Sequence, residues 1–326
     1  MSHLCTFRDL AVPPPPSAFY EPHVLIFMAV YNGERFLEEQ LDSIQRQSHR
    51  NWTLVVSDDG STDGTSSILE GYRRRWGAER LVVVQGPCKG FVANFLSMTC
   101  VHPAHADFYA WSDQDDIWHA EKLEAALNEL VLLPKHMPVL YCSRTELVLE
   151  SGQPAGHSPL FSREPNFINA LVQNIGGGNT MVFNAATRRL LKCAGSEVDV
   201  PSHDWWAYQL VTGAGGITVY DHQARISYRQ HGANLVGANS SWAARITRLN
   251  MLLGGRFSDW NDRNIRALNS MREHLTPENS RSLDLFISSR RQALQTRLRW
   301  ALRSGVYRQT LMGNIGLLLA ALLNRL

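Results

Sequence analysis

The sequence contains few cysteines, and they form no recognisable pattern. There are five, an odd number, and no two of them form a C-x-x-C pair; they are Cys5, Cys88, Cys100, Cys142 and Cys193. This excludes a disulfide framework and zinc-finger spacing, and it favours a reducing compartment. The N-terminus also lacks a basic stretch followed by an apolar one, which argues against a secretory signal and favours a cytoplasmic protein.

Long apolar segments are missing as well. No segment reaches the roughly 18 uncharged apolar residues that a transmembrane helix requires. The nearest approach is 311–323, which is interrupted by Gly313, Asn314 and Gly316. We therefore predict no membrane span, but this segment is long enough to lie along a membrane surface.

A strong overall charge is lacking too. The formal net charge is +2, so the whole chain has no electrostatic signature of a nucleic-acid binder. The charge is uneven, however: residues 240–326 hold 14 arginines and 5 acidic residues, a net +9, which leaves −7 for residues 1–239. An acidic body with a basic tail predicts that the tail meets an anionic surface.

Apolar runs and helical patterns alternate along the first part of the chain. With 326 residues and 44% hydrophobic content, the chain can form one large domain with an appendage. The predicted strands cover 23–30, 52–57, 81–85 and 108–112, and the predicted helices include 37–44, 68–76 and 91–99. This alternation predicts an α/β domain with a mostly parallel sheet.

The remaining chain changes character twice. Short strands of antiparallel appearance are predicted at 139–143, 180–183, 217–220 and 225–228. Beyond about Gly237 the strand pattern stops, and arginine-rich amphipathic helices are expected. We therefore divide the chain into a flexible proline-rich leader (1–22), an α/β domain (23–237) and a helical C-terminal extension (238–326).

Polar clusters follow three of the predicted strands. They are Tyr31-Asn32-Gly33, Asp58-Asp59-Gly60-Ser61-Thr62-Asp63-Gly64 and Asp113-Gln114-Asp115-Asp116. Ligands bind at the carboxyl ends of strands in open α/β sheets. Three acids within residues 113–116 repel one another unless a cation or another positive partner is present. An oxygen-only ligand set suits Mg²⁺ or Mn²⁺, and Mg²⁺ commonly shares its ligands with substrate phosphates.

These three motifs, in this order, resemble glycosyltransferase family 2, whose members have the GT-A fold. The resemblance covers roughly residues 23–235, and the Ser112–Trp118 segment is similar to the DXD-type motif of its rhamnosyltransferase-like branch. It implies an inverting, metal-dependent transferase. The implied donor is a nucleotide sugar, by best match dTDP-L-rhamnose. The implied acceptor is a lipid-linked glycan or a growing cell-surface polysaccharide such as O-antigen. A UDP-hexose or UDP-N-acetylhexosamine donor is the alternative.

The resemblance also implies roles for individual residues. Asp58 would bond the pyrimidine base, Asp113 would contact the ribose, and Asp115 would ligate a Mg²⁺ or Mn²⁺ ion, with Asp116 assisting. The complete implied nucleotide-sugar set is Tyr31, Asn32, Asp58, Asp59, Lys89, Asn94 and Asp113. For Lys89, an exposed loop cation is an equally good interpretation.

Glycosyl transfer needs a base for the acceptor hydroxyl. The segment 202–206 resembles the family's acceptor-side acidic motif, and Asp204 is the predicted base. His203 is the alternative base because an unperturbed histidine titrates near pH 6.5, and Asp204 as a simple helix cap is a further interpretation. Trp205 and Trp206 could offer a stacking face to a sugar, although we expect one of them to lie in the core.

Two more segments complete the predicted site. Gly177, Gly178 and Asn179 lie in a glycine run that, by resemblance, shapes the sugar or acceptor pocket. His231 could ligate the cation or a phosphate oxygen, and Arg229 could pair with the diphosphate. A strand-end histidine satisfied by the backbone is the alternative for His231.

Other functions were weighed against a transferase. A phosphohydrolase built on Asp58 and Asp59 would want a partner lysine that the later strands do not provide. A processive synthase would usually carry membrane helices and a Gln-x-x-Arg-Trp motif. A nucleotide-binding scaffold with a membrane-binding tail is the non-enzymatic alternative. Lipid-linked acceptors lie at the inner face of the cytoplasmic membrane, so we expect the basic tail to hold the protein there; packing of the tail on the domain is the alternative.

Overall fold

The computed structural model describes residues 21–231, 256–290, 292–295, 297, 299 and 304–325. Residues 1–20 of the predicted leader lie outside the described residues. The same holds for residues 232–255, which include the predicted boundary near Gly237. The division into leader, domain and extension therefore stays a prediction.

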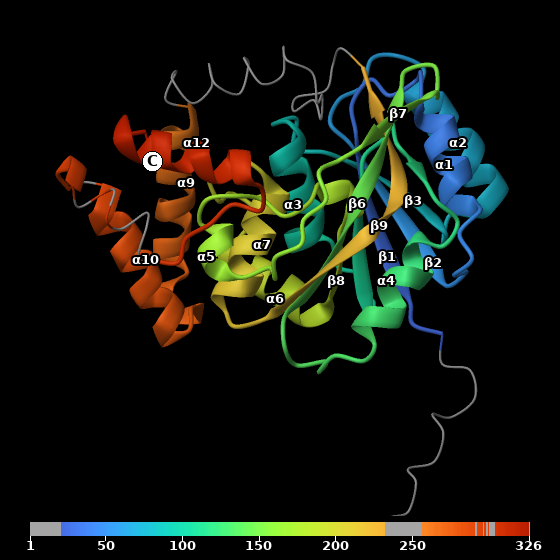
Figure 1. Ribbon diagram of the computed structural model, residues 1–326. Coiled ribbons are helices and arrows are strands. Elements are labelled where there is room, and N and C mark those ends of the chain that lie inside the picture. The colour runs from blue at the N-terminus through green and yellow to red at the C-terminus, as the bar shows by residue number, and fades with distance from the viewer. Residues whose placement is uncertain are drawn as a thin grey trace, which may run out of the picture.

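A single sheet of nine strands organises the fold (Figure 1). Its order is β3-β2-β1-β4-β8-β6-β9-β5, and β7 pairs with β6. The strands are β1 (Val24–Val30), β2 (Trp52–Asp58), β3 (Leu81–Gln85), β4 (Phe108–Ser112), β5 (Ile117–Trp118), β6 (Val139–Leu149), β7 (Pro154–His157), β8 (Val182–Asn184) and β9 (Ile217–Gln230). The predicted α/β class is confirmed.

Strand direction changes only around β8 and at the edges. β3, β2, β1 and β4 are parallel, as predicted, and β8 runs antiparallel to both β4 and β6. The antiparallel expectation is wrong for the pair β6 and β9, which are parallel to each other. The two short strands predicted at 217–220 and 225–228 are one continuous strand, β9. Polar residues in its middle interrupt the apolar pattern and shift the register against β6, but the strand continues beyond them.

Helices cover both faces of the sheet. They are α1 (Leu37–Gln45), α2 (Thr65–Trp76), α3 (Phe91–Val101), α4 (Lys122–Leu130), α5 (Phe167–Ala170), α6 (Ala185–Ala194) and α7 (His203–Gly213). Alternate residues of β1 separate the two cores: Ile26 packs in the core of α1, α2 and α4, whereas Phe27 packs in that of α3, α6 and α7. A strand buried on both faces explains the unbroken apolar run in the sequence.

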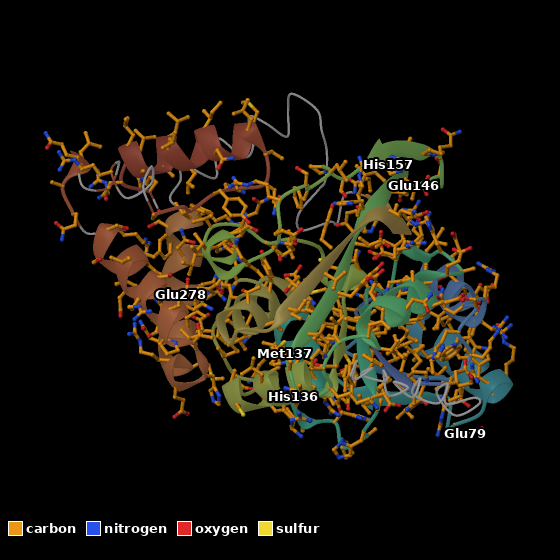
Figure 2. All side chains as sticks on the ribbon, turned by 60° about the horizontal axis from the view of Figure 1, so that its bottom comes forward. Glu79, His136, Met137, Glu146, His157 and Glu278 are labelled. Carbon is orange, nitrogen blue, oxygen red and sulfur yellow. The ribbon has the colours of Figure 1, made fainter. Side chains whose placement is uncertain are left out.

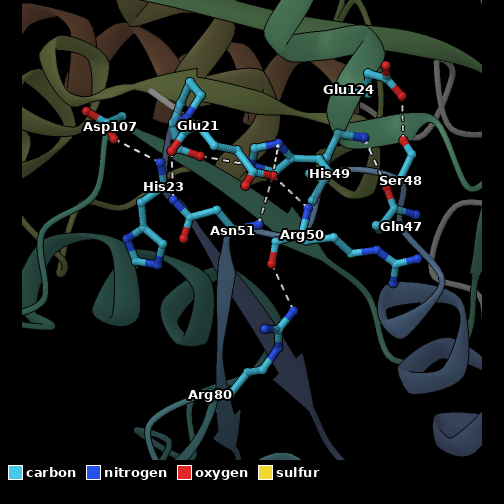
Figure 3. A network of polar contacts seen from close by, with 12 residues as sticks. Glu21, His23, Gln47, Ser48, His49, Arg50, Asn51, Arg80, Asp107 and Glu124 are labelled. Atoms are coloured by element: carbon cyan, nitrogen blue, oxygen red, sulfur yellow. Dashed lines mark hydrogen bonds and ion pairs between the residues drawn. The ribbon is translucent and has the colours of Figure 1, made fainter. Parts of the chain in front are cut away.

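The edge where β1 and β2 begin is closed by a polar network (Figure 3). The His23 amide donates to Asp107 Oδ2 at 2.9 Å, and Asn51 Nδ2 donates to the Glu21 carbonyl at 2.7 Å. These groups satisfy one another. The opposite edge, where β1, β2 and β4 end, carries the polar loops predicted from the sequence.

β6 reaches the edge of the sheet where β1, β2 and β4 end, and it extends past that edge. Leu140 of β6 and Tyr109 of β4 both face Phe183 of β8, so β6 runs in the same direction as β4 and Ser143 lies level with Ser112. Figure 2 shows His136 and Met137 at the start of β6, and Glu146 and His157 at its far end beside β7. The middle of β6 thus stands level with the acidic loop after β4.

The C-terminal extension forms helices, as predicted, beside α5 and α7 (Figure 1). They are α9 (Arg256–Ser270), α10 (Pro277–Arg290) and α12 (Leu311–Leu322). Phe257 of α9 stacks on Trp205 with ring centroids 6.5 Å apart, and Arg263 pairs with Asp199 at 2.7 Å. Within the described residues, no helix has both the length and the apolar character needed to cross a bilayer. The contacts of Phe257 and Arg263 show that one side of the extension packs on the α/β body.

Candidate active site

The loops after β1 and β2 are joined by side-chain hydrogen bonds. The Asn32 amide donates to Ser61 Oγ at 2.9 Å, and Asn32 Oδ1 accepts from the Thr62 amide at 2.8 Å. Asn32 has a φ of 49°, a left-handed conformation that asparagine tolerates better than most residues. The neighbouring Tyr31 is 58% exposed. The two loops therefore present an accessible aromatic ring on a fixed backbone.

Asp58 and Asp59 have different environments despite being adjacent. Asp58 Oδ1 accepts from the amides of Gly60 and Ser61, whereas its Oδ2 has no hydrogen-bond partner among the described residues. Asp59 uses both oxygens, accepting from the amides of Cys88 at 2.7 Å and Gly90 at 2.8 Å. Asp58 thus keeps one oxygen for a ligand, and Asp59 fixes the loop that carries Lys89.

The remaining predicted nucleotide residues on this side also differ in exposure. Lys89 Nζ is 2.9 Å from Glu197 Oε2, and both side chains are exposed. Asn94 is buried, and its Nδ2 donates to the Ser57 carbonyl at 3.0 Å. Asn94 therefore anchors α3 to the end of β2, while Lys89 lies at the surface.

Gln114 links the acidic loop to the end of β1, a role that sequence analysis missed. Its Oε1 accepts from the Tyr31 amide at 2.8 Å, and its Nε2 donates to the Tyr31 carbonyl at 3.1 Å. A Cβ at Gly33 would lie 2.6 Å from Gln114 Oε1, so only glycine leaves room for this contact. The glutamine stands inside the motif, but nothing in its spacing shows which backbone it contacts.

The acidic loop after β4 holds carboxyl groups in a shared, poorly solvated environment. Burial, followed by the nearby carboxylates of Asp115 and Asp204, raises the pKa of Asp113 to about 8. Burial, with the charges of Asp115 and Asp113, also raises the pKa of the fully buried Asp116 well above its usual range. Asn179 Nδ2 donates to Asp116 Oδ2 at 2.6 Å. Asn179, which lies in the glycine run, therefore holds the acidic loop in place through Asp116.

The end of β9 meets the same loop through two side chains. His231 Nε2 lies 2.7 Å from Asp115 Oδ2. Arg229 is buried and donates to Glu39 Oε2 at 2.7 Å and to the Asp115 carbonyl at 3.2 Å. The expectation that Arg229 pairs with a diphosphate is not supported, because its guanidinium group is occupied by protein acceptors.

The charged groups of this loop can be compared with the needs of a cation. Within the part of the chain that the structure describes, no group of three or more His, Cys, Asp or Glu side chains is arranged to hold a metal ion. Mg²⁺ bound with phosphates needs only one or two protein carboxylates, because phosphates and water supply the other ligands. Asp115, with His231 Nε2 2.7 Å from its Oδ2, fits such a shared site and not a closed protein cage.

Asp204 reaches this cluster from the first turn of α7. Its Oδ2 accepts from the Gly178 amide at 3.1 Å, and its Oδ1 accepts from the Trp205 amide at 2.7 Å. Gly178 begins the short 3₁₀ helix η1 (Gly178–Thr180). The carboxylate is oriented by two backbone donors at a helix N-terminus, where negative charge is favoured.

His203, the alternative base, is enclosed by aromatic rings. Its ring stacks on Phe95 at 4.2 Å between centroids and meets Trp111 edge-on at 4.7 Å. Neither ring nitrogen has a hydrogen-bond partner among the described residues. Burial lowers its pKa to about 4. This environment keeps the imidazole neutral and encloses it among aromatic rings, with His203 only 3% exposed, so Asp204 is better placed to receive a proton.

The predicted pocket residues separate into two groups. A Cβ at Gly177 would lie 2.5 Å from Asn179 Oδ1, and one at Gly178 would lie 2.4 Å from His203 Nε2, so both glycines permit close approach. Trp205 and Trp206 are only 4% and 0% exposed. Neither indole presents a stacking face, because α9 covers one and the sheet-side core encloses the other. The predicted sugar-stacking role of this pair is therefore not supported.

Sequence analysis also missed a buried lysine, Lys122, which lies near Asp116 of the acidic loop. Lys122 begins α4 and is 0% exposed, with its Nζ 3.5 Å from the centroid of the Trp118 ring. Burial lowers its pKa to about 7, against the opposing influence of the Asp116 charge. A lysine in the first turn of an amphipathic helix is ordinarily exposed, so no pattern in the sequence indicates that this one is buried.

Comparisons with known proteins identify the family. The family model described as "Glycosyl transferase family 2" matches residues 25–191, and the chain belongs to this family. It is 28% identical over 234 residues to the dTDP-rhamnosyl transferase RfbG of Shigella flexneri, covering 69% of this chain and 78% of that protein. It is 36% identical over 115 residues to the putative glycosyltransferase EpsE of Bacillus subtilis, covering 35% of this chain and 40% of that protein.

Solved structures show the same fold at low sequence identity. S. aureus TarS 1-349 in complex with UDP has a TM-score of 0.50 and 18% identity, over 86% of this chain and 75% of that one. The mannosyltransferase PcManGT from Pyrobaculum calidifontis, in complex with GDP-Man and Mn²⁺, has a TM-score of 0.50 and 18% identity, over 98% and 89%. The fold is GT-A, and the chain is a glycosyltransferase. The scaffold and phosphohydrolase alternatives are therefore set aside.

Proposed function

We propose that this transferase moves a sugar from a nucleotide sugar to a glycan acceptor by a single, inverting displacement. The observation that carries this proposal is the link between the acidic loop and Asp204 through the glycine run: Asn179 Nδ2 donates to Asp116 Oδ2 at 2.6 Å, and the neighbouring Gly178 amide donates to Asp204 Oδ2 at 3.1 Å. The charges of Asp115 and Asp204 also contribute to the raised pKa of Asp113. Donor-side and acceptor-side carboxylates therefore border one reaction space.

The donor would lie across the ends of β1, β2 and β4. The exposed Tyr31 ring and the unpartnered Asp58 Oδ2 suit a nucleoside base, and Asp113 suits a ribose hydroxyl. Lys89 can turn from Glu197 toward a diphosphate at small cost, because an exposed ion pair contributes only about 0–1 kcal/mol. Asp59 and Asn94 would act indirectly by holding the loop and α3 in place.

The chemistry divides between leaving group and nucleophile. Asp115, with His231 beside it, would hold a Mg²⁺ or Mn²⁺ ion, which would neutralise charge on the departing nucleoside diphosphate when bound. Asp204 would take the proton of the acceptor hydroxyl as its oxygen bonds to the anomeric carbon and the bond from that carbon to the diphosphate breaks. Attack from the side opposite the leaving group inverts the anomeric configuration.

The donor sugar is proposed from relatives. The RfbG match supports dTDP-rhamnose as the donor. We extend the proposal to assembly of a cell-surface polysaccharide such as O-antigen. A UDP-hexose is the alternative. It is favoured by 30% identity over 119 residues to the UDP-Glc:alpha-D-GlcNAc-diphosphoundecaprenol beta-1,3-glucosyltransferase WfgD of Escherichia coli, covering 36% of this chain and 44% of that protein.

We also propose that α12 places the enzyme on the cytoplasmic face of an anionic membrane, where a lipid-linked acceptor would lie. One face of α12 is packed, with Leu317, Ala320 and Ala321 buried. The other face is apolar and between 42% and 77% exposed; it comprises Leu311, Met312, Ile315, Leu319 and Leu322. The net +9 of residues 240–326 complements anionic headgroups. The packing alternative is thus supported for one face only.

A donor screen tests the proposed function. The purified chain would be incubated with dTDP-rhamnose, UDP-glucose, UDP-galactose or UDP-N-acetylglucosamine, each with a lipid-linked acceptor, and nucleoside diphosphate release would be measured. We expect acceptor-dependent release from one donor, with dTDP-rhamnose the leading candidate. Release from none of the four, under conditions where Mg²⁺ and Mn²⁺ are both supplied, would contradict the proposal.

A further inference from the structure

A cavity of about 200 Å³ lies beside the glycine run, on the side of β4 away from the predicted nucleotide residues. Its walls include Thr145 of β6, Tyr220 of β9, Phe161 and Gly177. In the sheet, β8 and β6 separate β4 from β9, so the cavity is displaced from the loops after β1 and β2. Its volume is below the 300–1,000 Å³ typical of drug-sized pockets, which suits one small ring.

Irregular strand pairing creates this cavity. The register of β6 against β9 shifts between Ser143 and Arg144 and again between Arg144 and Glu146, so Thr145 has no partner in β9. Bulges of this kind redirect side chains next to active sites. The Thr145 amide donates to Ser158 Oγ at 3.0 Å, and Arg144 Nε donates to the Ser158 carbonyl at 2.8 Å. The outer wall at 158–161 is therefore fastened to the bulge.

The lining combines aromatic faces with available polar groups. Phe161 and Tyr220 have ring centroids 5.5 Å apart and inclined by 34°. The Thr145 hydroxyl and the side-chain nitrogen Asn174 Nδ2 have no hydrogen-bond partner among the described residues. Proteins recognise a sugar by packing aromatic side chains against the C–H faces of its ring and by hydrogen-bonding its hydroxyl groups. The cavity offers both kinds of contact.

The cavity adjoins the proposed base. Gly177 lines it, and the amide of the next residue, Gly178, donates to Asp204 Oδ2 at 3.1 Å. Ser143 also lines the cavity and lies level with Ser112, directly before Asp113. A ring seated here is therefore beside Asp204 and at the height of the acidic loop, on the side opposite the nucleotide.

We infer that this cavity binds the terminal sugar ring of the acceptor. Tyr220 and Phe161 stack against the ring, Thr145 and Asn174 bond its hydroxyls, and the hydroxyl to be glycosylated points toward Asp204. This inference rests on the proposed function, since it assigns the acceptor side of that same reaction. The cavity supplies the aromatic contact that Trp205 and Trp206 do not.

Saturation-transfer NMR with methyl glycosides of rhamnose, glucose and N-acetylglucosamine tests this on the full chain, with dTDP or UDP present. We expect at least one glycoside to bind, and Tyr220→Ala and Thr145→Val to weaken it about tenfold. Leu160→Ala is the matched control, because Leu160 lies in the same wall segment but is 51% exposed and does not line the cavity. Thermal unfolding of each variant verifies folding, and Thr145→Val preserves side-chain shape.

The outcomes separate the two proposals. Calorimetry with dTDP and UDP reports the nucleotide site alone: binding of neither contradicts the proposed function itself. Nucleotide binding without glycoside binding, or glycoside binding unchanged in both variants, overturns the acceptor assignment only. Variants that weaken a nucleotide sugar but not its nucleoside diphosphate would give the cavity to the donor's sugar and also overturn it.

Discussion

His231 Nε2 lies 2.7 Å from Asp115 Oδ2, although 116 residues separate them in the sequence. The contact brings the end of β9 onto the acidic loop after β4. Phe36 stacks on the same imidazole with ring centroids 5.4 Å apart. The Asp115 carboxylate is therefore oriented by His231, whose ring is in turn held by Phe36.

Replacing Asp115 tests the proposed cation site. Asp115→Ala should reduce transfer below detection, because a methyl group cannot ligate a divalent cation. In the wild type, EDTA should abolish activity, and Mg²⁺ or Mn²⁺ should restore it. Asp284→Ala is the matched control, since the partner of that exposed carboxylate among the described residues is Arg272 on the extension. Full wild-type activity in chelator would refute the cation's role.

Asp204→Asn should lower turnover by about 10²–10⁴-fold, the range for loss of a general base. The amide keeps the side-chain shape and one acceptor oxygen, which can serve either the Gly178 or the Trp205 amide but not both. Neither bond involves the predicted nucleotide residues, so donor affinity measured by calorimetry should change little. Ser202→Ala provides a control because Ser202 is the N-cap residue but makes no side-chain cap bond. Near-normal turnover of Asp204→Asn would show that the carboxylate is structural.

His203 should make the fold sensitive to acid. Its folded pKa of about 4 is below the unfolded value of 6.5, so the unfolded chain binds the proton more readily and stability falls as pH decreases through this interval. The loss from this group is on the order of 3 kcal/mol. The denaturant midpoint of the wild type should fall relative to that of His203→Leu between pH 7 and pH 4.5, because the variant lacks this histidine. A constant difference would contradict the assignment.

Liposome sedimentation tests the exposed face of α12. Leu319→Gln with Leu322→Gln should shift the protein from the pellet to the supernatant with anionic vesicles at low salt. Both side chains are exposed, so the packed face around Leu317 is preserved, which deletion of the helix would not achieve. Leu285→Gln, at an exposed position of α10, controls for general loss of apolar surface. Wild-type protein that stays in the supernatant would disprove membrane association.

Much of the donor side of the fold could be predicted because local signals agree there. β3 and β4 have the predicted bounds, since each is an apolar run that ends in a polar residue; β4 is buried throughout, whereas the edge strand β3 is only partly buried. The sequence predicts two strands in place of β9 because Asp221, His222 and Gln223 break the apolar pattern, although pairing with β6 resumes after them. Sequence periodicity cannot show that a strand continues past a bulge of its own.

The side-chain environments were harder to predict than the elements. Trp205 and Trp206 are both in the core because α7 is enclosed between the sheet and α9, and that enclosure depends on a segment more than fifty residues later. Arg229 is occupied by Glu39, a residue of α1. Such pairings arise from topology and leave no trace in local spacing.

The double hydrogen bond between Gln114 and the Tyr31 backbone has a consequence for the thermodynamics of donor binding. It joins the loops after β1 and β4 before any ligand arrives. A nucleotide would then lose little free energy to the ordering of those loops. Gln114→Ala should retain the ligand-contacting side chains but release this constraint. In calorimetry, the weaker binding should appear as a less favourable entropy, with the enthalpy of binding largely retained.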